Sequence, residues 1–297
     1  MSKIVLGTAQ LGSNYGITNK NPEGSIEKTK KIIEFARKKG IDTLDTAMDY
    51  AFESLSNSVS ISDFNINTKL PKVPEKEKKI SNWIEKKVEQ SMKNLEIKKI
   101  NCLLLHNPNQ LQKKGGEEIW KTLKNLKKKD LVKKIGISIY DTNKVEKYLS
   151  EFKPDVIQSP FNIIDRRVLH SNWLKKAKKK GVEIQVRSIF LQGILLLDKD
   201  ELPKEFHKWK PIWKKMSLFL KKRNYTKLQL LISFVQSFKE IDNVIVGVDN
   251  LTQLEEILDL ELININGFPD LSSRDEKLIN PLNWPLYKKN KKDFLDA

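Results

Sequence analysis

The chain is poor in cysteine and has no long apolar run. Cys102 is the one cysteine among 297 residues, which excludes an internal disulfide framework and predicts a reducing compartment. No apolar stretch approaches the roughly 18 residues of a membrane-spanning helix. The opening MSKIVLGTAQLG turns polar at once and is therefore not typical of a secretory signal peptide. We expect a cytoplasmic protein with no membrane partner.

Acidic residues are also scarce relative to basic ones. The chain has 38 aspartates and glutamates against 55 lysines and arginines, a formal net charge of +17. Such an excess can neutralise the phosphates of a nucleic acid. Here, however, the lysines lie on the polar faces of many predicted helices, for example KKIIEFARKKG and WLKKAKKKG, and are not gathered with aromatic residues in one segment. We therefore expect solvated helix surfaces, a general attraction for anionic ligands and no nucleic-acid partner.

Two familiar binding signatures are missing as well. The three histidines, His106, His170 and His207, lie far apart and show no ligand spacing, so no metal site is expected. The GxGxxG fingerprint of a Rossmann dinucleotide site is absent. Any dinucleotide cofactor would therefore be bound by another arrangement.

No linker rich in proline, glycine or serine divides the chain, and its length fits a single α/β barrel. Short apolar runs rich in β-branched residues alternate with longer segments of helical period, as in repeated βα units. We predict eight strands, at residues 4–7, 43–45, 65–69, 100–106, 134–138, 156–159, 183–188 and 243–246.

Amphipathic segments that fill the gaps between these runs predict helices. They lie at residues 25–40, 80–95, 117–130, 142–152, 171–181, 226–238 and 251–262, with Gly40 and Gly181 at two helix ends. This alternation favours one closed (β/α)8 TIM barrel over residues 1–297, with an open doubly wound sheet as the alternative.

Two segments depart from the repeating pattern. One, at about residues 191–225, contains His207, Trp209 and Trp213 and forms either a substrate wall or an extra helix held to the barrel. The other is the C-terminal tail at about 262–297, whose NPLNWPLYKK stretch is a candidate to reach the pocket. We expect substrate specificity to depend on such loops and on the tail.

Four polar side chains lie at or just beyond the ends of predicted strands. Asp45 ends IDTLDTA, Tyr50 follows five residues later, Lys69 ends FNINTK, and His106 ends INCLLLHNP. Because the carboxyl ends of barrel strands meet at one face, we expect these side chains to lie together. A lysine cation beside a tyrosine favours ionisation of the phenol, an aspartate holds the lysine, and a histidine orients a carbonyl or passes a proton. Taken singly, each has a structural explanation: a helix cap, a rim aromatic, a strand-end lysine and a core histidine.

In this order the four residues resemble the catalytic tetrad of the aldo/keto reductase family. The resemblance covers about residues 4–257 through IVLGTAQLG, GIDTLDTAMDY, INTK, SMKNLEIKKINCLLLHNP, IWKTLKNLKKKDLVKKIGISIYD, PDVIQSPFNIIDRR and VIVGVDNLTQLEEI. It implies a TIM barrel that uses NAD(P)H to reduce the carbonyl of a small molecule, with Tyr50 as the general acid. RSIFLQG resembles a bacterial subgroup associated with surface-polysaccharide biosynthesis, which implies a sugar or nucleotide-sugar carbonyl and a place in carbohydrate metabolism.

The resemblance also implies where a nicotinamide cofactor would bind. Ser138 and Gln158 correspond to the residues that hold the carboxamide, and Arg187 occupies a position where many members have a stacking aromatic. NADP(H) is expected more than NAD(H), although Gly247 and Gln253 stand where some members have basic residues. The cofactor-binding set expected on this basis is Gly7, Thr8, Ser138, Gln158, Arg187, Gly247, Asn250, Gln253 and Glu256.

A second class of function stays open at this point. Some relatives keep the barrel and the cofactor but act as regulatory or accessory subunits with little turnover. The presence of Asp45, Tyr50, Lys69 and His106 together favours an enzyme. The sequence does not indicate an oligomeric state.

Overall fold

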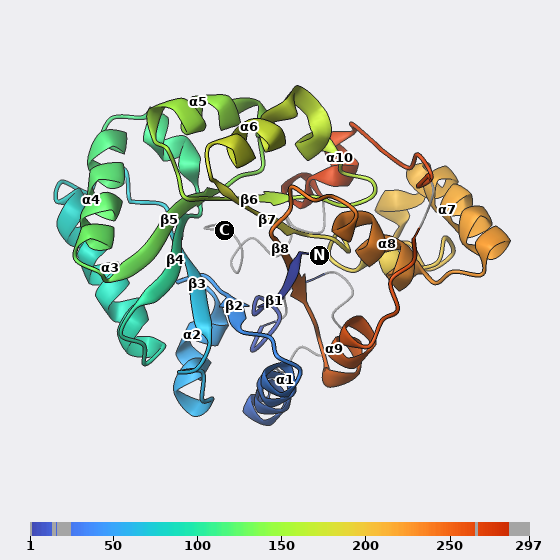
Figure 1. Ribbon diagram of the computed structural model, residues 1–297, viewed down its shortest axis with the longest axis horizontal. Helices are drawn as coiled ribbons and strands as arrows, with labels where there is room; N and C mark the ends of the chain where they lie inside the picture. The colour runs from blue at the N-terminus through green and yellow to red at the C-terminus, as the bar shows by residue number, and fades with distance from the viewer. Residues whose placement is uncertain (1, 14–15, 17–24, 265–266, 285–297) are drawn as a thin grey trace.

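Eight parallel strands close into a barrel in the computed structural model, which describes residues 2–13, 16, 25–264 and 267–284 (Figure 1). Neighbours in the barrel are neighbours in sequence, and the first strand pairs with the eighth in register from Lys3↔Asn243 to Gly7↔Gly247. The strands are β1 (Lys3–Gly7), β2 (Thr43–Asp45), β3 (Asn65–Leu70), β4 (Ile100–Leu105), β5 (Val132–Ser138), β6 (Val156–Pro160), β7 (Glu183–Arg187) and β8 (Asn243–Gly247). The predicted TIM barrel is confirmed, and the open doubly wound sheet is wrong.

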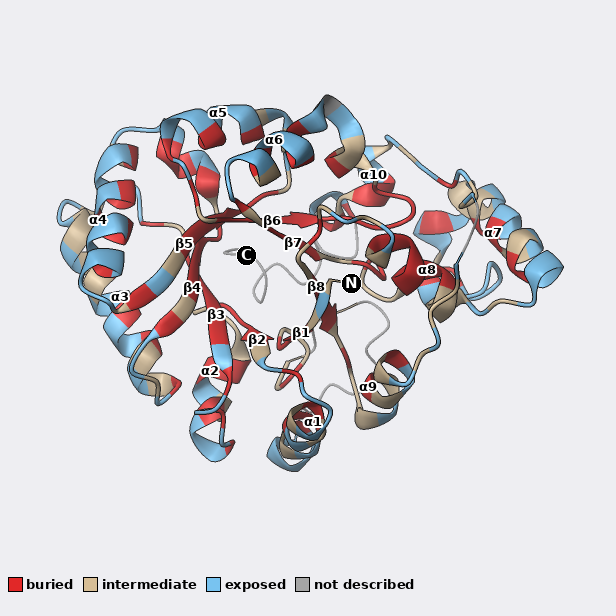
Figure 2. Ribbon diagram, in the orientation of Figure 1, coloured by how far each residue is buried: buried red, intermediate tan, exposed pale blue. Residues whose placement is uncertain are grey.

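Helices surround the barrel and turn their polar sides to solvent, whereas the strands are largely buried (Figure 2). The helices are α1 (Ile26–Lys38), α2 (Ala51–Leu55), α3 (Ile80–Asn94), α4 (Gly116–Lys128), α5 (Val145–Glu151), α6 (Trp173–Lys179), α7 (Lys210–Arg223), α8 (Lys227–Gln236), α9 (Leu251–Leu258) and α10 (Glu276–Ile279). Among the described residues, none of the helices is both long and apolar enough to cross a lipid bilayer.

The sequence pattern predicted the main elements to within a few residues. Each of the eight predicted strands overlaps an observed strand, and each of the seven predicted helices overlaps an observed helix. Gly40 and Gly181 follow α1 and α6 with φ of 80° and 75°, the left-handed conformation that ends helices and favours glycine. At α8 a capping box joins Thr226 and Gln229, because each side chain bonds the other residue's backbone N–H.

The segment at 191–225 contains α7, which lies farther from the barrel than α8 (Figure 1). Trp213 is fully buried there and donates from Nε1 to the carbonyl of Ile194 at 3.3 Å. Trp284, from the NPLNWPLYKK stretch, packs edge-on against Phe206 of the same segment with ring centroids 4.9 Å apart. Trp213 therefore fixes α7 to the turn around Ile194, and Trp284 attaches the C-terminal segment to the same part of the chain. The rest of that stretch, from residue 285, lies outside the described residues.

The interior of the barrel is unusually polar. A small apolar cluster of Cys102, Leu104 and Val156 is separate from the main core, which lies between strands and helices. Above and around it the inward-facing side chains of β2, β3, β6 and β7 include Asp45, Lys69, Gln158, Gln185 and Glu183. Because buried polar groups are costly unless they are hydrogen-bonded, this arrangement places strict demands on their partners.

Candidate active site

A cavity of about 350 Å³ opens at the carboxyl ends of the strands. It extends from the end of β2 to the region after β8. Its lining includes Gly7, Thr8, Gln10, Asp45, Tyr50, Lys69, His106, Tyr140, Arg187, Ser188, Gln192, Gly247, Asp249, Gln253 and Glu256. The four residues expected to be catalytic thus share one pocket, as the ends of parallel barrel strands allow.

A buried ion pair between Asp45 and Lys69 lies at the base of this pocket. Lys69 Nζ donates to Asp45 Oδ1 at 2.5 Å and to the carbonyl of Thr46 at 2.8 Å. The Lys69 side chain is 2% exposed and the Asp45 side chain is 6% exposed, so both charges have lost most of their hydration. The second carboxylate oxygen, Oδ2, accepts from Gln158 Nε2 at 2.9 Å. Each charge therefore has a second hydrogen-bond partner, as a buried pair requires.

Tyr50 lies close to both this lysine and the histidine. Lys69 Nζ is 5.6 Å from the centroid of the Tyr50 ring. The His106 ring stands edge-on to that of Tyr50, with centroids 6.2 Å apart. Tyr50 precedes α2 as its N-cap residue, in extended conformation, so the position of its ring depends on how α2 is held against the barrel.

Glu53 anchors α2, and no pattern in the sequence indicated this role. Its carboxylate accepts from Thr68 Oγ1 at 2.8 Å and from Ser91 Oγ at 2.9 Å. Burial raises the pKa of Glu53, aided by the charge of Asp49, although the two hydroxyl hydrogen bonds oppose this rise. Since Thr68 precedes Lys69 on β3, Glu53 links the helix that carries Tyr50 to the strand that carries its lysine.

His106 is a neutral imidazole at physiological pH. Burial lowers its pKa to about 3, and the nearby charges of Lys69 and Arg187 act in the same direction. A neutral imidazole carries one N–H donor. His106 can therefore donate one hydrogen bond to a ligand oxygen, but it carries no additional proton to transfer.

The expected carboxamide residues lie deeper than the pocket lining. Ser138 and Gln158 are 1% and 0% exposed, and their side chains approach each other at 3.5 Å between Oγ and Oε1. Gln158 also contacts Asp45, so these two expected cofactor residues are joined to the ion pair. A hydroxyl donor and an amide oxygen together match the C=O and NH2 groups of a carboxamide.

Arg187 is held against an aromatic ring that the sequence reasoning missed. Its guanidinium carbon lies 4.1 Å from the centroid of Tyr140, and its Nη2 donates to the carbonyl of Ile139 at 3.4 Å. Tyr140 follows Ser138 by two residues beyond the end of β5 and lines the pocket. The sequence signal that could have identified Tyr140 is its position just after the end of a predicted strand. Arg187 and Tyr140 thus form a cation–π pair. Arg187 is the residue at the position where the family resemblance implies a stacking aromatic in many members.

The other end of the pocket is acidic. It is lined by Gly247, Asp249, Gln253 and Glu256. Burial raises the pKa of Asp249, and the hydrogen bond from Gln253 opposes this rise. Gln253 Oε1 accepts from the backbone N–H of Asp249 at 2.8 Å. Asn250 is not part of the lining, because its side chain caps α9 by accepting from the N–H of Gln253. Lys69 and Arg187 are the cations of the described lining, and both lie close enough to His106 for their charges to lower its pKa.

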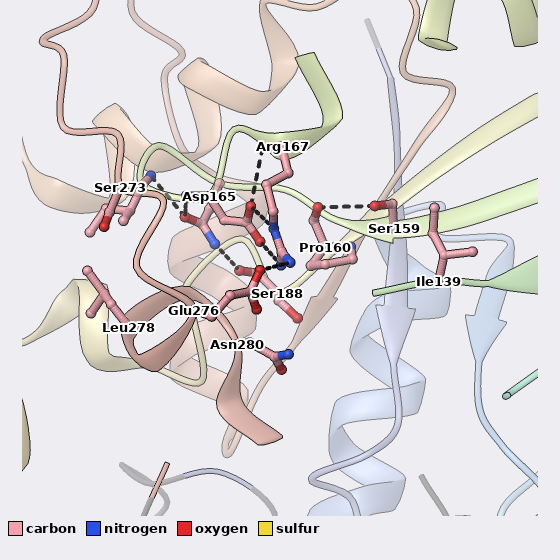
Figure 3. Close-up of polar contacts among 12 residues, drawn as sticks. Ile139, Ser159, Pro160, Asp165, Arg167, Ser188, Ser273, Glu276, Leu278 and Asn280 are labelled. Carbon is pink, nitrogen blue, oxygen red and sulfur yellow. Dashed lines mark hydrogen bonds and ion pairs between the residues drawn. The ribbon is translucent and has the colours of Figure 1, made fainter. Parts of the chain in front are cut away.

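A group of polar side chains around Asp165 and Arg167, called here the polar clamp, lies beside Ser188 (Figure 3). Asp165, which is fully buried, binds Arg167 through two hydrogen bonds of 2.9 and 2.8 Å, and Arg167 Nη1 reaches Glu276 of α10 at 2.8 Å. Asn162 Nδ2 donates to the carbonyl of Ser188 at 3.0 Å. Ser188 has a left-handed φ of 59° and lines the pocket. The clamp therefore connects the C-terminal segment with the pocket wall.

Comparisons with known proteins agree with the fold. Residues 3–267 match the sequence model of the Aldo/keto reductase family. Among solved structures, the holo form of the aldo-keto reductase AKR11C1 from Bacillus halodurans is similar, with a TM-score of 0.69, 18% identity and coverage of 88% of each chain. The glycerol dehydrogenase AKR11B4 from Gluconobacter oxydans gives a TM-score of 0.66 and 20% identity, over 92% of this chain and 88% of that one. No curated protein matches in sequence.

Replacing Glu53 tests the anchor of α2. Glu53→Ala removes the acceptor of two buried hydroxyls and leaves a cavity, so we expect the free energy of unfolding to fall by about 2–4 kcal/mol. Glu53→Gln keeps the volume and an acceptor oxygen, so we expect a smaller loss. Urea denaturation of both variants measures the difference. Equal losses would contradict a hydrogen-bonded anchor.

The low pKa of His106 predicts a stability that depends on pH. The folded-state pKa of about 3 lies below the ordinary value of 6.5, so the unfolded chain binds a proton that the folded chain does not between these values. The free energy of unfolding should therefore fall as pH drops from 6.5 toward 3, by at most about 1.4 kcal/mol per unit from this group. His106→Asn should reduce this slope, while His170→Asn, at an exposed position, serves as the control. Parallel slopes for wild type and His106→Asn would show that His106 is not the group responsible.

Proposed function

Because the chain belongs to the aldo/keto reductase family, we propose that it is an NAD(P)H-dependent reductase that converts a carbonyl to an alcohol with Tyr50 as the general acid. The observation that carries this proposal is the gathering of Tyr50 with a buried Lys69–Asp45 ion pair and a neutral His106 in one pocket. These side chains come from three separate stretches of the chain, around Asp45 and Tyr50, Lys69, and His106.

The side chains of the site divide the work of the reaction. The reduced nicotinamide, when bound, supplies a hydride to the carbonyl carbon. Tyr50 donates its phenolic proton to the carbonyl oxygen, where negative charge develops. Lys69 stabilises the resulting phenolate electrostatically, and Asp45 holds Lys69 in place. In the oxidation of an alcohol, the same groups act in reverse order.

His106 positions the substrate rather than protonating it. With a pKa of about 3 it is neutral, so its N–H can donate to the carbonyl oxygen without competing with Tyr50 as the proton source. Its edge-on placement beside the Tyr50 ring brings both groups to the same region of the pocket. An oxygen bound there would be held by two donors, which is the arrangement that aligns a carbonyl for attack.

The proposed substrate is a small aldehyde, ketone, sugar or nucleotide-sugar carbonyl. The sugar proposal comes from the RSIFLQG resemblance, and the pocket lining adds polar groups, including Gln10, Ser188 and Gln192. Such groups match hydroxylated substrates, because hydroxyl groups need hydrogen-bond partners when they leave water.

Tyr50→Phe tests the general acid. The ring is retained and the proton donor is lost, so turnover should fall by about 10² to 10⁴-fold while cofactor binding stays nearly unchanged. Tyr148→Phe is the matched control, because Tyr148 is buried on α5, away from the pocket. The assay follows oxidation of NADPH and NADH with a panel of simple aldehydes, sugars and nucleotide sugars. Wild-type rates in Tyr50→Phe would show that the acid has been assigned wrongly.

The same panel separates an enzyme from an accessory subunit. Tight cofactor binding by the wild type, with no reduction of any carbonyl in the panel, would favour a nicotinamide-binding accessory subunit. Reduction that depends on Tyr50 favours the enzyme.

From the family resemblance we propose that the protein binds NADP(H) in preference to NAD(H), with a small difference in affinity. The acidic end of the pocket supports the small difference, since Asp249 and Glu256 line it and the cations of the described lining are elsewhere. A 2′-phosphate bound beside Asp249 would meet a like charge.

Replacing Asp249 tests this interpretation. Asp249→Asn removes the charge and keeps the shape, so affinity for NADPH should rise by roughly threefold while affinity for NADH stays constant. Fluorescence titration with both cofactors measures the two dissociation constants. An equal change for both cofactors would show that Asp249 does not face the 2′ position.

A further inference from the structure

A series of hydrogen bonds runs inside the barrel from the start of β7 to the catalytic carboxylate. Glu183 Oε1 accepts from Gln185 Nε2 at 2.8 Å. Gln185 Oε1 accepts from Gln158 Nε2 at 3.1 Å, and the same nitrogen donates to Asp45 Oδ2 at 2.9 Å. Gln158 and Gln185 are register partners on β6 and β7 and are at most 1% exposed. Two carboxylates are therefore joined through two buried amides, which we call the amide chain.

The carboxylates fix the direction of every hydrogen bond in the amide chain. An ionised carboxylate only accepts hydrogen bonds. Glu183 therefore binds the NH2 group of Gln185, whose oxygen is turned toward Gln158. Gln158 must then donate to Gln185, and it must also donate to Asp45. Both hydrogens of its nitrogen are used, so its oxygen is left on the side that faces Ser138 Oγ.

The far end of the amide chain is held as an acceptor by two further donors. Lys134 Nζ donates to Glu183 Oε2, and Asn243 Nδ2 donates to Oε1 at 2.7 Å. Burial lowers the pKa of Lys134, but the hydrogen bond and charge of Glu183 outweigh this effect and the pKa lies above its usual value of 10.5. Lys134 thus stays protonated at neutral pH and can only donate. Because Glu183 remains an acceptor, turning the amide of Gln185 around would place an amide oxygen against a carboxylate oxygen and lose the hydrogen bond between them.

We propose that Gln185 is a positioning residue that, together with Glu183, fixes the amide of Gln158 so that its oxygen is presented to the carboxamide of the cofactor. This inference rests on the proposed nicotinamide site. With the cofactor bound, the oxygen of Gln158 would accept from the carboxamide NH2, and the single O–H of Ser138, which here donates to Gln158 Oε1 at 3.5 Å, would turn to the carboxamide C=O. Like Ser138 and Gln158, Gln185 and Glu183 lie behind the residues that line the pocket. Gln185 is hydrogen-bonded to Gln158, so it would act on the cofactor through Gln158.

The consequence is selectivity for a carboxamide over a group of the same shape without an NH2. In the 3-acetylpyridine analogue of NADP⁺, a methyl ketone replaces the carboxamide. The wild type should bind NADP⁺ more tightly than this analogue by about threefold to tenfold, the effect of one hydrogen bond. We call the dissociation constant of the analogue divided by that of NADP⁺ the carboxamide ratio. A site whose Gln158 amide can turn should have a ratio closer to one.

The experiment compares the carboxamide ratio of four variants with that of the wild type by isothermal titration. Gln185→Met keeps the volume but removes the acceptor that holds Gln158, so the ratio should fall. Gln158→Met defines the ratio of a site without the amide oxygen. Asn101→Ala is the control, because it removes an interior hydrogen bond to Asn67 between β4 and β3 without touching the amide chain, and the ratio should stay at the wild-type value.

Gln185→Glu, the fourth variant, is the decisive comparison. A carboxyl at this position lies within hydrogen-bond distance of Glu183, and two carboxyl groups so close share one proton. The protonated carboxyl that this substitution introduces would donate to Glu183 and accept from Gln158, as the native amide does. We therefore expect the carboxamide ratio to be largely restored in Gln185→Glu, although Gln185→Met and Gln185→Glu have similar volumes.

Each outcome bears on the proposal. A reduced ratio in Gln185→Met together with a restored ratio in Gln185→Glu supports it. A wild-type ratio in Gln185→Met overturns it, and so does a weakening of both ligands by the same factor, because a merely structural residue would act in that way. If the wild type bound neither ligand, the proposed function itself would fail and this inference with it, which distinguishes the two failures.

Discussion

The structure depends on keeping the Asp45–Lys69 pair charged inside a barrel from which water is largely excluded. Burying two ions costs several kcal/mol for each unless geometry and further hydrogen bonds compensate. The compensation here comes from the carbonyl of Thr46 and from the amide of Gln158. Removing one partner would leave an uncompensated charge, at a cost of about 3–5 kcal/mol. The apolar cluster within the barrel comprises Cys102, Leu104 and Val156, and Gln158, which bonds the ion pair, lies on the same strand as Val156.

The same cation has two effects on the side chains above it. Lys69 disfavours a second positive charge, so it helps to hold the pKa of His106 at about 3. It favours a negative charge on its other neighbour, Tyr50. In the proposed mechanism the histidine therefore donates a hydrogen bond, and the tyrosine is the side chain that releases a proton. In this proposal, one buried charge separates the orienting role from the acid role, and it does so only because α2 keeps Tyr50 close to β3.

The sequence predicted the barrel and the gathering of Asp45, Tyr50, Lys69 and His106, because both follow from local patterns. Strand ends are marked by polar residues after apolar runs, and parallel strands bring those ends to one face. Glu53 could not be found in this way, since a glutamate on a short helix ordinarily faces solvent, and only the packing of α2 on β3 and α3 buries it. The pairing of Tyr140 with Arg187 and the acidic end of the pocket likewise depend on how separate loops meet.

The direction of the hydrogen bonds in the amide chain depends on residues that are even farther apart in the sequence. The sequence identifies Gln158 and Gln185 as polar residues on strands, but a glutamine donates and accepts equally well in isolation. Direction arises because both ends of the chain, Glu183 and Asp45, are acceptors. In any row of amides between two acceptors, one member must donate to both sides, and the oxygen of that member has no partner within the row. Here that member is Gln158. That oxygen accepts from the hydroxyl of Ser138 at 3.5 Å. The arrangement that stabilises the buried aspartate therefore turns the oxygen of Gln158 toward the other residue that is expected to bind a carboxamide.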